Sequence, residues 1–176
     1  MARLTQLSDG SFLDRDDPGE ACYVTGAPRI SVTADEAMML GELARGANVL
    51  EIGTGLGVST RGMAATAKRL VTVDNDPWVH ADVWPTLTKF DNVETSEAIP
   101  LHESFDMVFV DGSHDGDQIV RDLRGILPVC LPDTRVVFHD VKYKHVFDVV
   151  TKVCAKLKVI ETAHGLGIAT AGDIAV

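Results

Sequence analysis

The chain has 176 residues, a formal net charge of -10 and 45% hydrophobic residues. This length predicts one globular domain, and the acidic balance argues against a nucleic-acid substrate, whose phosphates are held by basic patches. No apolar run approaches the ~18 residues of a membrane span, and the N-terminus lacks the apolar core of a signal peptide.

Residues 1–30 combine acids, glycines and prolines without clear periodicity, so they are predicted to form an irregular N-terminal arm that could close over a site. Residues 31–176 are predicted to form the single folded domain. Its first helix begins after Thr33, because Glu36 follows three residues later as in a capping box, and it ends at Gly46.

Short apolar strands and amphipathic helices then alternate along the chain. This order predicts an α/β domain with a mostly parallel, doubly wound sheet that carries helices on both faces. The last two strands flank a short glycine-containing turn and are expected to pair as an antiparallel hairpin. The predicted strands are 49–52, 70–73, 93–95, 107–110, 135–138, 158–161 and 167–170, and the predicted helices between them are 58–67, 77–89, 118–127 and 146–157.

A glycine-rich turn follows the first of these strands. Gly53, Gly55 and Gly57 alternate with other residues between the strand and the next helix. Glycines leave the backbone bare, and N–H groups at a helix N-terminus suit a polar or anionic ligand. The dinucleotide fingerprint G-x-G-x-x-G would need its third glycine at Val58. The turn therefore indicates a nucleotide-type cofactor other than a dinucleotide, with a plain strand–helix turn as the alternative.

The spacing Glu51-x-Gly53-x-Gly55-x-Gly57 resembles the first motif of class I S-adenosylmethionine-dependent methyltransferases, E/D-x-G-x-G-x-G. The resemblance implies a Rossmann-like seven-stranded sheet with an antiparallel last strand. It also implies that S-adenosylmethionine contacts this turn. The expected contacts are Glu51, Gly53, Thr54, Gly55, Gly57 and Ser59.

Two further strand ends offer polar groups to such a cofactor. Asp74 ends the second strand, where a carboxylate can accept both ribose hydroxyls, and Asn75 follows it. Asp76 precedes Pro77 and is better explained as a helix cap. After the third strand, the resemblance points to Ser96 and Glu97 as adenine contacts, and a solvated loop is the alternative there.

The segment from Phe105 to His114 is the most specific after the glycine turn. An apolar strand delivers Asp111 to the edge where ligands of doubly wound sheets bind, and His114 follows three residues later. Catechol-type O-methyltransferases carry Asp-x-x-Lys here, and enzymes resembling the macrolide-sugar type carry Asp-x-x-His. The resemblance implies Asp111 as a catalytic and cofactor-site acid and His114 as the general base.

The next strand supplies Asp140, whose position beside Asp111 would suit a divalent cation, magnesium or manganese. The similar families carry Asp-Asn or Glu-Asp at this point. Here either His139 replaces the glutamate or Val141 replaces the asparagine, so His139 is the third expected ligand. In the alternative interpretation, Asp140 caps the next helix and His139 packs or contacts substrate.

The predicted function is transfer of a methyl group from S-adenosylmethionine to the hydroxyl of a small molecule. The alternatives are an NAD-dependent oxidoreductase and a catalytically silent cofactor-binding subunit. Cys22, Cys130 and Cys154 match no metal spacing and are interpreted as reduced thiols of a cytoplasmic protein. The acidity suits either solubility or steering of a cationic cofactor. Little chain remains for a substrate lid, so a second copy of the chain is a plausible partner.

Overall fold

The computed structural model describes residues 4–6, 12–14, 23–24, 27–28 and 32–176. Within the N-terminal arm, β1 (Leu4–Gln6) pairs with β2 (Phe12–Asp14), and β3 (Tyr23–Val24) pairs with β4 (Ala27–Pro28), both antiparallel. The arm was expected to be irregular, which is wrong for these short strands. The rest of the predicted arm, including Cys22, lies outside the described residues.

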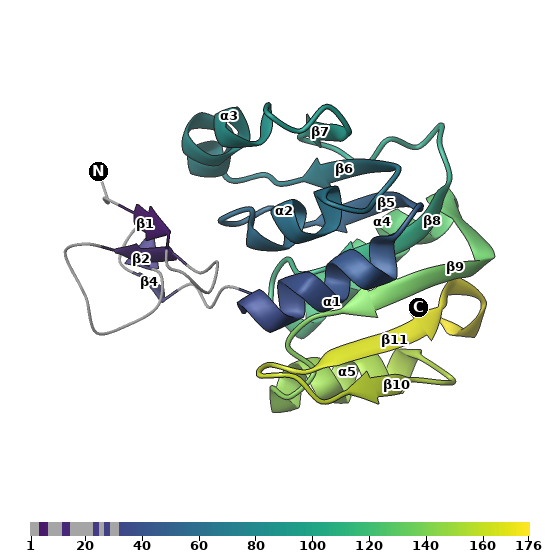
Figure 1. Ribbon diagram of the computed structural model, residues 1–176. Coiled ribbons are helices and arrows are strands. Elements are labelled where there is room, and N and C mark those ends of the chain that lie inside the picture. Colours follow the sequence, from purple (N-terminus) through teal and green to yellow (C-terminus); the bar gives the residue numbers. More distant parts are fainter. Residues whose placement is uncertain (1–3, 7–11, 15–22, 25–26, 29–31) are drawn as a thin grey trace.

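The main sheet has seven strands, and its order matches the predicted fold class (Figure 1). Five strands are parallel, and β11 runs antiparallel to both of its neighbours, β9 and β10. In sheet order the strands are β10 (Lys158–Ile160), β11 (Leu166–Thr170), β9 (Cys130–Phe138), β8 (Phe105–Val110), β5 (Asn48–Ile52), β6 (Arg69–Val73) and β7 (Val93–Ser96).

Helices cover both faces of this sheet (Figure 1). On one face α1 (Ala34–Ala44) crosses α2 (Val58–Ala64), and on the other α4 (Gly116–Ile126) packs near α5 (Lys144–Val153). Helices α1 and α2 approach closely at Gly62. A Cβ there would lie 2.4 Å from the carbonyl oxygen of Ala37, so the approach requires glycine. Thr33 and Glu36 form the predicted capping box at the start of α1.

The central strands are apolar toward both helical layers, as the parallel arrangement requires. In β8, Val108 packs in the cluster beneath α4 and α5, and Phe109 packs in the cluster beneath α1 and α2. Both side chains are fully buried. Among the residues that the structure describes, no helix has the length and apolarity to cross a membrane.

The predicted helix 77–89 differs most from the structure. It contains a π-helical turn, η1 (Val79–Val83), followed by the short α3 (Trp84–Leu87). Pro85 has no N–H for a regular helical bond to residue 81, and the Trp84 N–H instead reaches the carbonyl of Val79. Other predicted helices shift by a few residues, and α4 continues into the 3-10 turn η2 (Leu127–Val129).

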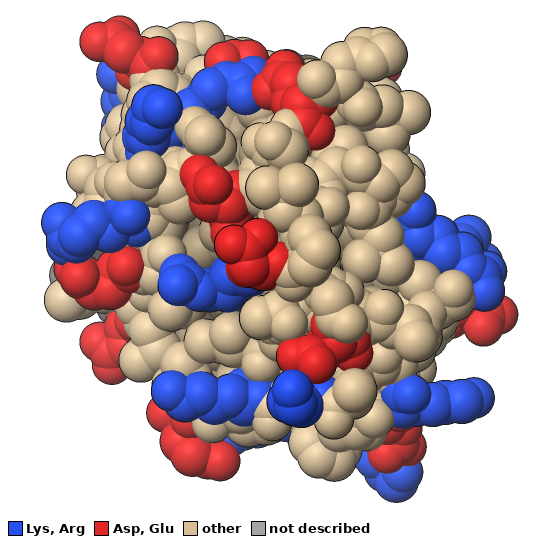
Figure 2. All heavy atoms as spheres, turned by 90° about the vertical axis from the view of Figure 1, so that its right-hand side faces the viewer, with Lys and Arg blue, Asp and Glu red and all other residues tan. Residues whose placement is uncertain are grey.

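The carboxyl ends of β5, β6, β7, β8 and β9 all lie at one edge of the sheet because these strands are parallel. Figure 2 shows the opposite end of the molecule, where Lys and Arg side chains lie among Asp and Glu side chains. Positive and negative side chains are therefore mixed on that face. The chemistry-bearing residues predicted from the sequence gather at the other edge.

Candidate active site

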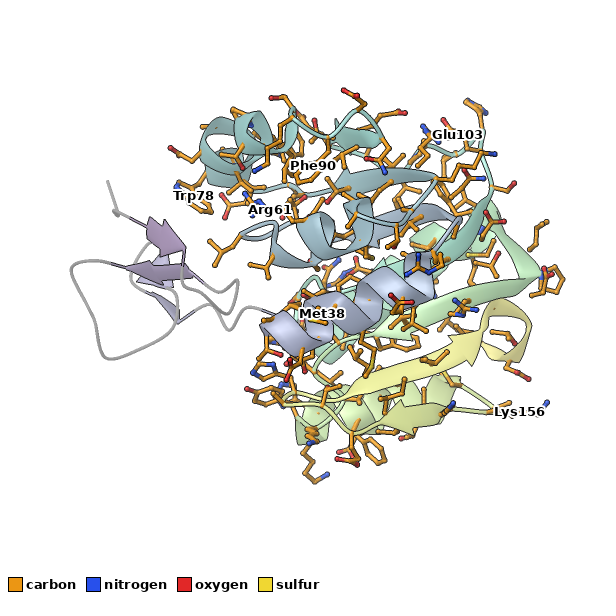
Figure 3. All side chains as sticks on the ribbon, in the orientation of Figure 1. Met38, Arg61, Trp78, Phe90, Glu103 and Lys156 are labelled. Carbon is orange, nitrogen blue, oxygen red and sulfur yellow. The ribbon has the colours of Figure 1, made fainter. Side chains whose placement is uncertain are left out.

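A cavity of about 800 Å³ opens at the carboxyl ends of the parallel strands. Its walls come from the turn after β5 and from the segments after β6, β7 and β8. Figure 3 labels Arg61 and Trp78 at this end of the sheet, and Glu103 and Lys156 at the opposite end. The volume falls in the range of sites for small molecules and cofactors, ~300–1,000 Å³.

Two glycines of the turn after β5 have different reasons to be glycine. At Gly53, a Cβ would lie 2.3 Å from the carbonyl oxygen of Asp111, so a side chain would force β5 and β8 apart. At Gly55, φ is +48° and a Cβ would meet nothing within 4 Å. Because Gly55 also lines the cavity, its missing side chain leaves space for a ligand.

Asp74 organises this turn. Its Oδ2 accepts hydrogen bonds from the N–H groups of Thr54, at 2.9 Å, and Gly55, at 3.0 Å. Its Oδ1 accepts from the N–H of Asp76 at 2.9 Å. The expectation that the N–H groups of the turn face a ligand therefore does not hold for Thr54 and Gly55. Asp74 lines the cavity and is half-buried, so its expected contact with a ribose stays a prediction.

Glu51 lies beneath the turn and does not line the cavity. Its carboxylate is fully buried and accepts hydrogen bonds from the hydroxyls of Ser59, at 2.5 Å, and Thr60, at 2.6 Å. Burial raises the pKa of Glu51 to about 7, against the opposing effect of these donors. The arrangement ties the start of α2 to β5. It places Glu51 behind the cofactor turn, whereas the sequence predicted a direct contact.

The residues after β6 and β7 divide between cavity and local structure. Asn75 and Glu97 line the cavity. Ser96 does not line the cavity, and its hydroxyl donates to the carbonyl oxygen of Ala98 at 2.6 Å. Asp76 accepts from the N–H of Trp78 at 2.9 Å, which matches the capping role expected for Asp76.

Sequence reasoning missed two aromatic residues that support this side of the cavity. His80 Nε2 lies 2.8 Å from the carbonyl oxygen of Asp74. Its ring stacks on Trp84 with centroids 3.9 Å apart, and the Trp84 indole N–H donates to the Thr54 hydroxyl at 3.3 Å. The signal for these contacts would have been the Asp74–His80 spacing across a helix start.

The ends of β8 and β9 bring together the three predicted metal ligands. His139 Nδ1 lies 3.1 Å from Asp111 Oδ1 and 3.1 Å from Asp140 Oδ2. Asp140 has a left-handed backbone, with φ at +59°, and its side chain is only 1% exposed. Its other oxygen, Oδ1, is buried without a hydrogen-bond partner among the described residues. The structure therefore assembles the group but leaves one carboxylate oxygen unsatisfied.

His114 joins this group to the cavity. Its Nε2 lies 2.5 Å from Asp140 Oδ2, and its side chain is 44% exposed where it lines the cavity. The hydrogen bond with Asp140 raises the pKa of His114, against the effect of its partial burial. A histidine held by a buried carboxylate at a cavity wall is the usual arrangement of a general base.

Glu36 and His164 extend the cluster behind His139, and sequence reasoning missed both. Glu36 is 0% exposed, and its Oε2 lies 3.4 Å from His139 Nε2 and 2.9 Å from His164 Nδ1. The sequence had indicated only a capping role for Glu36 and no role for His164. No local pattern could have found this pairing, since 128 residues separate the two.

Mutual contacts set the ionisation of the cluster. Burial lowers the pKa of His139, but the carboxylates of Asp111, Asp140 and Glu36 outweigh it and raise this pKa to about 12. Burial raises the pKa of Asp140, but hydrogen bonds with His114 and His139 outweigh it and lower this pKa to about 2. Burial raises the pKa of Asp111, and His139 opposes it. A divalent cation among these atoms would replace the proton on His139 Nδ1.

Several solved structures of other proteins have a similar fold. Cofactor-bound Rv0187 from MTB is 24% identical, with a TM-score of 0.69 over 83% of this chain and 84% of that chain. TomG from Streptomyces achromogenes, an O-methyltransferase involved in tomaymycin synthesis and solved with SAM, is 23% identical, with a TM-score of 0.66 over 81% and 82%. An O-methyltransferase from Bacillus cereus, solved with SAH, is 20% identical, with a TM-score of 0.62 over 81% and 82%. No curated protein matches the chain.

A family model described as a methyltransferase domain matches residues 50–141, just over half of the chain. The matched range begins in the strand before the glycine turn and ends just after Asp140. It thus contains the turn after β5 and the segments after β6, β7 and β8 that line the cavity, and it sets aside the alternative of an NAD-dependent oxidoreductase. The chain belongs to this family of methyltransferase domains and is an S-adenosylmethionine-dependent methyltransferase.

Proposed function

We propose that the protein transfers the methyl group of S-adenosylmethionine to a hydroxyl oxygen of a small molecule. The observation that carries this proposal is the position of His114. It lines the same cavity as the glycine turn and is held by the buried carboxylate of Asp140. A base beside a cofactor cleft suits an acceptor that must lose a proton as it attacks.

The lining of the cavity suits S-adenosylmethionine. The open space over Gly55 would fill if any side chain were present, and the adjoining wall offers the carboxylate of Asp74 and the side chain of Asn75. S-adenosylmethionine, when bound, supplies an electrophilic methyl group on its sulfonium. The residues around it then orient cofactor and acceptor for in-line displacement, and positioning of this kind supplies much of a rate acceleration.

The histidine needs its neutral form to act. A neutral His114 takes the proton of the acceptor hydroxyl on a ring nitrogen, and the adjacent Asp140 carboxylate stabilises the imidazolium that results. Asp140 also fixes the ring orientation, because its oxygen is 2.5 Å from His114 Nε2. Proton transfer of this kind needs no covalent intermediate.

A divalent cation, magnesium or manganese, is part of the proposal. Asp111, His139 and Asp140 would hold it, because their ligand atoms lie within 4.8 Å of one another and Asp140 Oδ1 has no hydrogen-bond partner among the residues that the structure describes. When bound, such a cation would lower the pKa of the acceptor hydroxyl. Chelation with EDTA is expected to lower turnover and added cation to restore it. Full turnover in EDTA would remove the cation from the proposal.

The acceptor class, cellular location and assembly also belong to the proposal. The net charge of -10 favours an acceptor other than nucleic acid. In the part of the chain that the structure describes, Cys130 and Cys154 are free thiols, which agrees with a reducing cytoplasm. A second copy of the chain is the proposed source of further acceptor contacts. Sedimentation of the purified protein tests that assembly.

The deciding experiment separates an enzyme from a silent cofactor-binding subunit. Purified protein is titrated with S-adenosylmethionine by calorimetry and then incubated with radiolabelled cofactor and a panel of small hydroxyl compounds. We expect micromolar binding and methyl transfer to at least one oxygen acceptor. Tight binding with no transfer to any hydroxyl, or transfer only to amines, would contradict O-methylation.

A further inference from the structure

We infer that Glu36 and His139 form a carboxylate–imidazole pair that makes the cation site a nitrogen-containing centre. Such a centre favours a later first-row cation, such as Co²⁺ or Zn²⁺, over Mg²⁺. The inference rests on the proposed cation at Asp111, His139 and Asp140. It changes the identity of the cation and gives a role to Glu36, a residue outside that ligand set.

The ligand atoms are spaced as neighbours around one ion. His139 Nδ1 lies 3.1 Å from an oxygen of Asp111 and 3.1 Å from an oxygen of Asp140. Adjacent ligands on an ion with bonds of ~2.1 Å lie roughly 3 Å apart. The spacing of His139 Nδ1 from both carboxylates therefore matches that of ligands on one ion, and the neutral form of His139 would offer the Nδ1 lone pair.

The other ring nitrogen is already committed to a carboxylate. His139 Nε2 lies 3.4 Å from Glu36 Oε2, and both side chains are at most 1% exposed. Metal-bound histidines usually donate their second N–H to a carboxylate, which fixes the tautomer and raises the basicity of the ligand nitrogen. Here a proton on Nε2 would face Glu36, which leaves Nδ1 for the cation.

Glu36 is held rigidly enough to fulfil this role. Its Oε1 accepts from the Thr162 hydroxyl at 2.7 Å and from the N–H of His164 at 2.8 Å. Its Oε2 accepts from the N–H of Thr33 at 3.0 Å and lies 2.9 Å from His164 Nδ1. Burial raises the pKa of Glu36, but the hydrogen bond with His139 and those from Thr33, His164 and Thr162 outweigh it and lower this pKa.

The side chain that follows Asp140 adds no oxygen ligand to this set. Val141, which follows Asp140, is 2% exposed and packs in the apolar cluster beneath α4 and α5. Its side chain has no donor atom for a cation. The remaining set of two carboxylates and one imidazole suits borderline cations, whereas Mg²⁺ prefers carboxylate, carbonyl and water oxygens.

The test compares cation affinities of Glu36→Gln and a matched control, Glu42→Gln. Glu42 lies on the same helix and is exposed, with an ion pair to Arg45, so its substitution removes an equal charge away from the site. Metal-free full-length proteins are titrated with Co²⁺ and Mg²⁺ by calorimetry. Because most sites bind Co²⁺ more tightly than Mg²⁺, the change in the affinity ratio is diagnostic.

We expect Glu36→Gln to lose about 10–100-fold in Co²⁺ affinity, with Mg²⁺ affinity little changed and Glu42→Gln equal to the parent. Equal Co²⁺ affinities for the two variants would overturn the inference. Binding of S-adenosylhomocysteine checks that Glu36→Gln is folded. If that variant does not fold, pulsed electron paramagnetic resonance of the Mn²⁺-loaded parent still decides, because coupling to an imidazole nitrogen supports the inference and its absence overturns it.

The proposed function can fail separately. A parent protein that binds neither Co²⁺ nor Mg²⁺, yet methylates a hydroxyl in excess EDTA, would overturn the cation and leave O-methylation intact. A parent protein that binds Co²⁺ with the expected dependence on Glu36, yet transfers no methyl group, would support the cation site and contradict O-methylation.

Discussion

The two walls of the cavity are built in different ways. In the cofactor wall, the Asp74 carboxylate accepts hydrogen bonds from the backbone N–H groups of Thr54 and Gly55, which are 20 and 19 residues away. The opposite wall joins His114 to Asp140 across 26 residues, and behind it Glu36 contacts His139 across 103. The first wall relies on backbone donors and the second on ionisable side chains.

This difference teaches where function is vulnerable. Backbone donors survive most substitutions, so the cofactor wall depends on the absence of side chains at its glycines. Buried ionisable groups depend on one another, since removing one partner leaves the other buried and unpaired. We therefore expect substitutions at the first wall to act on binding and those at the second wall to act on chemistry.

The largest expected effect separates the two walls directly. His114→Ala should reduce turnover by ~10²–10⁴-fold, the loss typical of a missing general base. Affinity for S-adenosylhomocysteine should stay at the parental value, because His114 is proposed to act on the acceptor and not on the cofactor. Steady-state kinetics and calorimetry measure the two. His102→Ala, at an exposed histidine in the loop before β8, is the control. Parental turnover in His114→Ala would remove this residue from the mechanism.

Gly55→Val should break the cofactor wall alone. The side chain would enter the open space at a left-handed backbone, so affinity for S-adenosylhomocysteine should fall about 100-fold, roughly 3 kcal/mol. Gly46→Val is a matched control, because Gly46 has φ at +70°, nothing within 4 Å of its Cβ and a place away from the cavity. Equal affinity in the two variants would show that Gly55 does not face the cofactor.

Glu51 provides a test by pH. Its pKa is raised to about 7 in the folded protein from an ordinary 4.5, so the folded state binds more protons than the unfolded state between these values. The free energy of unfolding should therefore fall as pH rises from 4.5 to 7, by up to about 3 kcal/mol, and this contribution should then level off. Urea unfolding of the parent and of Glu51→Gln measures it. The same pH dependence in both proteins would contradict the assignment.

The smallest effect is expected at the end of the sheet that Figure 2 shows, where charges pair in solvent. Arg69 binds Glu94, at 2.6 Å, and Glu103, and all three side chains are at least 30% exposed. Arg69→Ala should lower the free energy of unfolding by less than about 1 kcal/mol, and less still at high salt. Thermal unfolding at two salt concentrations measures this. A loss comparable to that of a buried pair would show that exposure does not separate these regions.

The sequence was sufficient to predict the order of strands and helices, the reversed β11, the glycine turn and the meeting of Asp111 with Asp140. These features follow from local periodicity and from one general rule, that parallel strands end at the same edge of a sheet. The capping box at Thr33 and Glu36 is equally local. Element boundaries moved by a few residues, and the π-helical turn near Pro85 was not foreseen.

Only the tertiary structure decided how the polar groups are shared. It placed Glu51 beneath the glycine turn, directed Asp74 onto the turn's own N–H groups, and joined Glu36 to His139 and His164. Such contacts depend on which face of a helix meets which strand end, and those of Glu36 join residues more than 100 positions apart. A sequence pattern carries residue types and spacings along the chain, whereas these contacts come from packing across it.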